Sequence, residues 1–142
     1  MITGAVTTDR EAVIRIVVRG PAGQEQEVEA VIDTGFDGWF SLPPALIALL
    51  ELPWRRRGRA LLADGNETVF DIYDGTVLWD GSQRRVAVDE ASTAPLVGMA
   101  LLDGYELSLL VRASNDQKAA LAIRYLFRSE PLGAGMPEVM AY

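Results

Sequence analysis

The stretch Val31-Ile32-Asp33-Thr34-Gly35 puts one carboxylate at the end of an apolar, β-branched run and follows it at once with a turn. A carboxyl group at the end of a buried strand costs free energy unless partners compensate for it. Chemical use is one reason to keep such a group, so Asp33 is a candidate catalytic acid/base residue. The same residues also favour a plain Asx turn at a strand end, and this stretch taken alone leaves both interpretations open.

The amino-acid composition excludes several catalytic mechanisms and kinds of site. The chain has 142 residues, the length of one domain, and 49% of them are hydrophobic, which is enough for a core. It contains no cysteine and no histidine. Ser-His-Asp catalysis, thiolate catalysis, disulfides and the usual His/Cys zinc sites are therefore excluded. An enzyme of this composition that works without a cofactor must use carboxylates, Lys, Tyr or hydroxyl groups.

The charge balance argues against two classes of partner. A net charge of −7 is unfavourable for binding nucleic acid or an anionic membrane surface, because both need a basic footprint. The one basic cluster, Arg55 to Arg57 with Arg59, is interpreted as a solvated strand edge. Residues 1–6 lack the features of a signal peptide, and no apolar run is long enough to cross a bilayer. The expectation is a cytoplasmic protein.

Short strands separated by turn residues dominate the pattern. The turn signals Asp64-Gly65-Asn66 and Asp80-Gly81 predict two β-hairpins. The expected strands are 12–18, 28–32, 39–42, 60–63, 68–73, 76–79, 85–88, 94–97 and 105–111, with short helical pieces at 45–50 and 99–102. Many short strands with little helix predict a small all-β barrel or sandwich.

The last part of the chain has a different character. Apolar residues between 119 and 127 recur at helical spacing, and Ser114 or Asn115 can cap a helix over about 116–127. Prolines and glycines follow, which predicts a loose end. We therefore expect a domain over residues 1–113 and a C-terminal helical extension over 114–142.

Several elements together, in order, carry a family resemblance. An apolar strand leads into Asp33-Thr34-Gly35; a hairpin with Ala63-Asp64-Gly65-Asn66 at its tip comes next, and Leu96-Val97-Gly98-Met99 comes last. In this order and spacing, over about residues 10–112, the chain resembles the retropepsin-like aspartic proteases of clan AA, in particular their small bacterial members.

The resemblance implies a closed retropepsin-like β-barrel that cleaves peptide bonds as a homodimer. Each subunit would supply one Asp33, and the two carboxyl groups would share a proton and activate water, with no metal or cofactor. Thr34 and Gly35 would support the active-site loop, as would Gly98. The resemblance assigns peptide substrate contacts to Asp37 and to the flap residues Ala63, Asp64 and Gly65.

Two departures from the family pattern leave other functions open. Ala100 stands where many members carry a polar residue, and a helix is expected where they have a terminal strand. One alternative is therefore a catalytically inactive, protease-like module that binds peptide or mediates dimerisation. Another is a carboxylate metal site formed by Asp33, Asp37 and Asp64.

Overall fold

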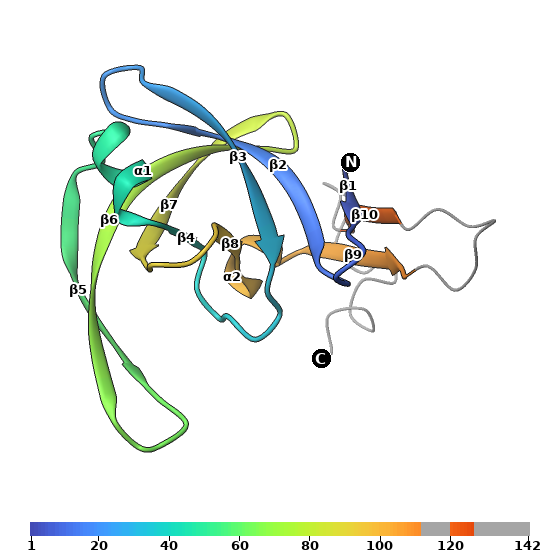
Figure 1. The fold of residues 1–142 in the computed structure, drawn as a ribbon. Helices are drawn as coiled ribbons and strands as arrows, with labels where there is room; N and C mark the ends of the chain where they lie inside the picture. Colours follow the sequence, from blue (N-terminus) through green and yellow to red (C-terminus); the bar gives the residue numbers. More distant parts are fainter. Residues whose placement is uncertain (112–119, 127–142) are drawn as a thin grey trace, which may run out of the picture.

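The structure, a computed structural model, describes residues 1–111 and 120–126 (Figure 1). The strands of this part are β1 Ile2–Val6, β2 Ala12–Arg19, β3 Glu25–Ile32, β4 Phe40–Leu42, β5 Trp54–Leu61, β6 Glu67–Trp79, β7 Ser82–Glu90, β8 Leu96–Val97, β9 Tyr105–Leu110 and β10 Ala120–Tyr125. Two short helices accompany them, α1 Pro44–Leu49 and α2 Met99–Leu102. The expected all-β class with short helices is therefore confirmed for the described residues.

Six of the strands close into a barrel. They pair in the order β6-β7-β4-β8-β3-β2, and β2 then pairs with β6 through Val18 and Val77. Strands β1, β10 and β9 continue the sheet from β2 and project from one side of the barrel (Figure 1). The closed barrel expected from the sequence is confirmed by this pairing.

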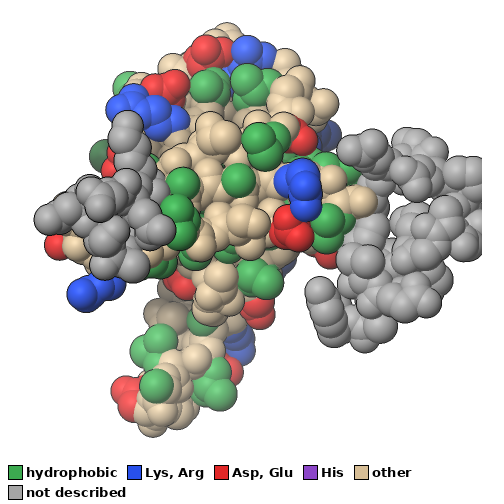
Figure 2. All heavy atoms as spheres, turned by 90° about the vertical axis from the view of Figure 1, so that its right-hand side faces the viewer, with side chains coloured by type: hydrophobic (Ala, Val, Ile, Leu, Met, Phe, Trp, Pro, Cys, Tyr) green, Lys and Arg blue, Asp and Glu red, His purple; other side chains and the backbone are tan. Residues whose placement is uncertain are grey.

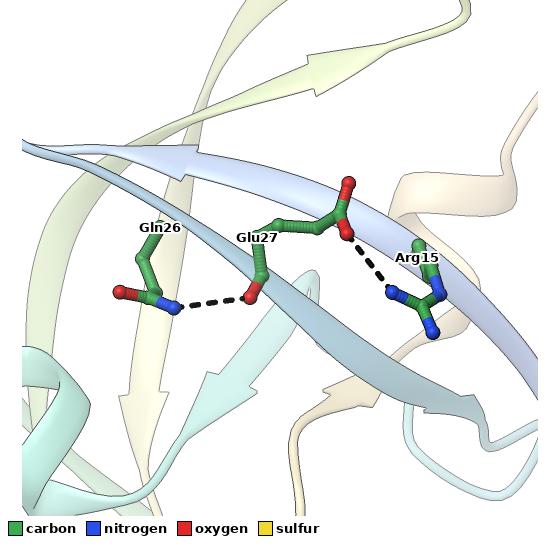
Figure 3. Close-up of polar contacts among 3 residues, drawn as sticks. All are labelled: Arg15, Gln26 and Glu27. Atoms are coloured by element: carbon green, nitrogen blue, oxygen red, sulfur yellow. Dashed lines mark hydrogen bonds and ion pairs between the residues drawn. The ribbon is translucent and has the colours of Figure 1, made fainter.

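Alternation of buried and more exposed side chains explains why β2 and β3 form two of the barrel walls. Along β2, Ile14, Ile16 and Val18 are buried, whereas Arg15 between them is exposed. Each buried aliphatic side chain of this size contributes about 1.5–3 kcal/mol. On the outer surface Arg15 pairs with Glu27 of β3 at 3.1 Å (Figure 3). Exposed pairs of this kind contribute little to stability, so the inward-facing residues determine the register.

Local turn chemistry produces the two expected hairpins. Asp80 and Gly81 both have positive φ angles, 50° and 82°, and form the two-residue turn between β6 and β7. A positive φ at both positions is the signature of a type I′ turn, which suits Asp-Gly. Gly65, with a φ of 86°, sits in the loop between β5 and β6. There the Leu62 N–H donates to Asn66 O at 2.7 Å.

The β5–β6 hairpin extends away from the barrel, at the bottom of Figure 1. Its four basic residues lie on β5, and three of them pair with acidic residues of β6. The pairs are Arg55 with Asp74 at 3.5 Å, Arg57 with Asp71 at 3.6 Å and Arg59 with Glu67 at 3.7 Å. The basic cluster is thus part of an exposed strand, and the neighbouring strand balances its charge.

The predicted C-terminal helix is wrong where the structure can be compared with it. Residues 120–125 form β10, which pairs with β9 and β1. Leu121 and Ile123 are buried and Arg124 is exposed, so the period is two, and an open edge of β1 is available for pairing. The rest of the predicted helix, 116–119 and 127, lies outside the described residues. Strand β1 is a further element that the sequence interpretation missed.

No helix among the described residues is both long and apolar enough to cross a membrane.

Candidate active site

The short strand β8 determines the position of Asp33. It lies between β3 and β4, parallel to β3 and antiparallel to β4. Ile32 is opposite Val97 in the first pair, and Phe40 is opposite Val97 in the second. The loop 33–39 therefore connects β3 to β4 and passes around the end of β8, which lies between them.

Backbone and side-chain hydrogen bonds hold Asp33 in this loop. Its N–H donates to Val97 O at 2.9 Å, and its Oδ1 accepts a hydrogen bond from the Gly35 N–H at 2.9 Å. Its carbonyl oxygen accepts from the Phe36 N–H at 3.1 Å. The carboxylate is thus fixed in an Asx turn while remaining partly open to solvent.

The start of α2 supports the same loop from behind. Gly98 N–H donates to Trp39 O at 3.0 Å, and Ala100 N–H donates to Gly38 O at 3.0 Å. Gly98 is buried, and a Cβ atom added to it would lie 2.1 Å from Gly38 O. Only glycine fits this contact without moving backbone. At Gly35 the corresponding contact is looser, 3.3 Å to Asp33 Oδ1.

Asp33 opens into a groove of about 840 Å³. The loop 33–39 and the β5–β6 hairpin project from the same end of the barrel (Figure 1) and both line this groove. The loop contributes Asp33, Gly35, Phe36 and Asp37, the hairpin contributes residues 59–61 and 68–70, and the rest of the lining is Ser41, Leu96 and residues 89–91. A groove of this size accommodates several side chains of an extended peptide.

Not every residue singled out from the sequence lies in the groove. Thr34 is exposed and is not part of the lining. Ala63, Asp64 and Gly65 are exposed at the far tip of the hairpin, beyond the hairpin residues that line the groove. Figure 2 shows this tip as a protrusion that carries hydrophobic and acidic side chains. At the tip, hydrogen bonds from the backbone and side chain of Asn66 lower the pKa of Asp64.

The sequence interpretation missed two groove residues. Asp89, near the end of β7, is half-buried, and its Oδ2 would lie 3.4 Å from a Cβ added to Gly38. Burial raises the pKa of Asp89 to about 6; Arg56 lowers it and Asp37 raises it, both by smaller amounts. Ser41 is the second, 3% exposed, with no hydrogen-bond partner for its Oγ among the described residues. Nothing local marks either residue, because β4 and β7 pair only in the folded chain.

A carboxylate metal site is not assembled by the described residues. They contain no group of three or more His, Cys, Asp or Glu side chains placed to hold a metal ion. Asp33 and Asp37 share the groove, but Asp64 at the hairpin tip does not line it. The metal hypothesis built on these three residues is therefore wrong.

Comparisons with known proteins find likeness at the level of structure. No family model and no curated protein matches the sequence. The chain is similar to the EIAV protease in complex with an inhibitor, at 15% identity and a TM-score of 0.49 over 68% of this chain and 89% of that chain. It is also similar to a retropepsin-like aspartic protease from Rickettsia conorii, at 14% identity and a TM-score of 0.49 over 84% of this chain and 87% of that one.

Proposed function

We propose that the chain is an aspartic endopeptidase that acts as a homodimer, with Asp33 of each subunit forming the catalytic pair. The observation that carries this proposal is the fixed carboxylate of Asp33 in the lining of a groove of about 840 Å³. The ordered motifs that resemble retropepsin-like proteases support the same reaction. The absence of His and Cys agrees with it, since two carboxyls and a water molecule suffice for peptide hydrolysis.

The chemistry requires a second copy of the chain. Two adjacent carboxyl groups cannot both ionise, so they hold one proton between them. The ionised carboxyl takes a proton from the attacking water, and the protonated one donates to the carbonyl oxygen of the peptide. One chain has a single Asp-Thr-Gly sequence, so a two-fold axis close to Asp33 would supply the partner carboxyl.

The roles of the neighbouring residues follow from this arrangement. The exposed Thr34 is available to the second subunit, where its hydroxyl would hold the two loops in register. Gly35 donates its N–H to Asp33 Oδ1 and fixes the orientation of the carboxylate. Asp37 lines the groove and is proposed to hold the substrate backbone. The β5–β6 hairpin, with Ala63 to Gly65 at its tip, would close over the peptide and exclude water.

Substitution of Asp33 by Asn tests the proposal. We expect Asp33→Asn to reduce cleavage of a mixed synthetic peptide library by roughly a thousandfold or more, because the acid/base function is lost. Asp9→Asn is the matched control, since Asp9 is exposed in the β1–β2 connection and does not line the groove. Circular dichroism and sedimentation should show the same fold and dimer for all three proteins. Cleavage by Asp33→Asn at the wild-type rate would contradict the assignment.

The same experiment distinguishes the proposed peptidase from the alternative, a catalytically inactive module that binds peptide. A protease-like module that only binds peptide would bind the library without cleaving it, and both variants would then be indistinguishable from the wild type in the cleavage assay.

A further inference from the structure

One part of the groove is acidic, and its carboxylates form no salt bridge with the residues that the structure describes. Asp89 of β7 is in register with Ser41 of the adjacent, parallel β4. The Asp89 carboxylate lies against Gly38, next to Asp37 in the loop 33–39. All three of Asp37, Ser41 and Asp89 line the groove, and we call them the acidic subsite.

We propose that the acidic subsite binds a basic side chain, Arg or Lys, of the peptide substrate. This inference rests on the proposed function in one respect only, namely that the occupant belongs to a substrate that is cleaved.

The charges of the lining support a cationic occupant. Its carboxylates are Asp33, Asp37, Asp89 and Glu90, and its only cation among the described residues is Arg59. Arg59 already pairs with Glu67 at 3.7 Å. Arg56 of β5, outside the lining, also acts on Asp89. The four carboxylates still outnumber the two cations, which favours a basic side chain over an acidic one.

Ser41 gives an observation independent of charge. Its neighbours in β4, Phe40 and Leu42, are fully buried in the core, so alternation directs Ser41 toward the groove that it lines. Its side chain is 3% exposed, and its Oγ has no partner among the described residues. Buried hydroxyl groups are nearly always hydrogen-bonded, so this one indicates a missing partner, which can be a donor because the hydroxyl oxygen accepts.

The chemistry of the three groups selects the donor. Two carboxylates accept hydrogen bonds only, and the Ser41 hydroxyl oxygen can accept as well. A guanidinium has five N–H donors and an ammonium has three, and neither has an acceptor. Such a group satisfies the whole subsite, whereas an apolar side chain would bury the carboxylates without partners.

The charged groups around Asp89 determine how this binding depends on pH. Asp37 faces it from the loop 33–39 and raises its pKa, Arg56 of β5 lowers it, and burial keeps it at about 6. Glu90 follows on the same strand and also lines the groove. Above pH 6 the Asp89 carboxylate is ionised and attracts a cation, and below pH 6 it is protonated. The preference for a basic side chain should therefore increase as the pH rises through about 6.

A digest of a synthetic random peptide library, sequenced by mass spectrometry, tests the subsite. For the wild type we expect enrichment of Arg or Lys at one fixed position relative to the cut, about tenfold over Met or Gln there. Asp89→Asn should abolish this enrichment. Glu27→Gln is the matched control, because it removes one negative charge on the outer face of β3 (Figure 3) and should keep the enrichment.

A second arm uses binding alone. Peptides captured from the same library by immobilised Asp33→Asn should show the same enrichment of basic residues, and the Asp33→Asn/Asp89→Asn double variant should lose it. Basic enrichment in capture without any cleavage by the wild type would refute the peptidase and leave the subsite standing. Cleavage with no basic preference, or a preference that survives Asp89→Asn, would overturn the subsite and leave the peptidase standing.

Discussion

Two aspartates that line the same groove, Asp33 after β3 and Asp89 on β7, differ in how visible they are from the sequence. Asp33 is visible without a structure, because a carboxylate between an apolar run and Thr-Gly is a local pattern. Asp89 is not visible, because its surroundings arise from the pairing of β4 with β7 across 48 residues of sequence and from the loop that carries Asp37. Local pattern can identify a reactive group, but it cannot identify a group whose environment is made by distant segments.

Asp89 also makes stability depend on pH in a defined direction. Its folded-state pKa of about 6 lies above the ordinary value of 3.8, so the folded protein binds the proton more tightly than the unfolded chain. Asp89 therefore destabilises the fold when ionised, and stability increases as the pH falls from above 6 toward 4. Since the carboxyl is only half-buried, solvent screening limits the effect to roughly 1 kcal/mol.

Asp89→Asn removes this dependence. We expect its Tm to exceed that of the wild type by about 2–4 °C at pH 8 and the difference to vanish near pH 4. Differential scanning calorimetry from pH 4 to pH 8 measures both. Glu27→Gln, on an exposed ion pair, should show no such trend. A Tm difference that stays constant across this range would mean that Asp89 has no raised pKa.

Among the helices and strands, those determined by local interactions are predicted correctly from the sequence, and those determined by contacts between distant segments are not. The two hairpins are predictable because Asp80-Gly81 and Asp64-Gly65 determine their turns locally. Residues 120–125 are not predictable in this way. A segment of only six residues in which Leu121 and Ile123 are buried is compatible with either a helix or a strand. Pairing with β1, more than a hundred residues earlier, decides for the strand. A strand is thus present where the sequence pattern predicts a helix.

The contact between α2 and the active-site loop gives an element-scale prediction. In Gly98→Ala the new Cβ would meet Gly38 O at 2.1 Å, and that atom belongs to the backbone. We expect a loss of about 1–3 kcal/mol in the free energy of unfolding, measured by urea denaturation, because the loop must move away from α2.

Gly35→Ala is the matched variant for this measurement. Its Cβ would meet only Asp33 Oδ1, at 3.3 Å, so the loss of stability should be well below that of Gly98→Ala. Equal urea midpoints for the two variants would show that the α2 contact does not hold the loop.

At the scale of the whole molecule, the proposed reaction needs two carboxyl groups, whereas each chain has one Asp-Thr-Gly sequence. The barrel is complete within one chain, since β2 pairs with β6, so no strand of a second chain is needed to close it. The groove, in contrast, contains one Asp33. Catalysis rather than folding is therefore the step that should depend on assembly, and mixing of subunits can isolate it.

Wild type mixed with a ninefold excess of Asp33→Asn should lose activity per wild-type chain. With random pairing, nine in ten wild-type chains have an inactive partner, so the rate of peptide cleavage should fall about tenfold relative to the same amount of wild type alone. A ninefold excess of Asp9→Asn, which keeps the carboxyl pair and is itself active, is the control and should raise the total rate about tenfold. If the rate per wild-type chain is unchanged by the Asp33→Asn excess after subunit exchange, each chain works alone and a shared carboxyl pair is ruled out.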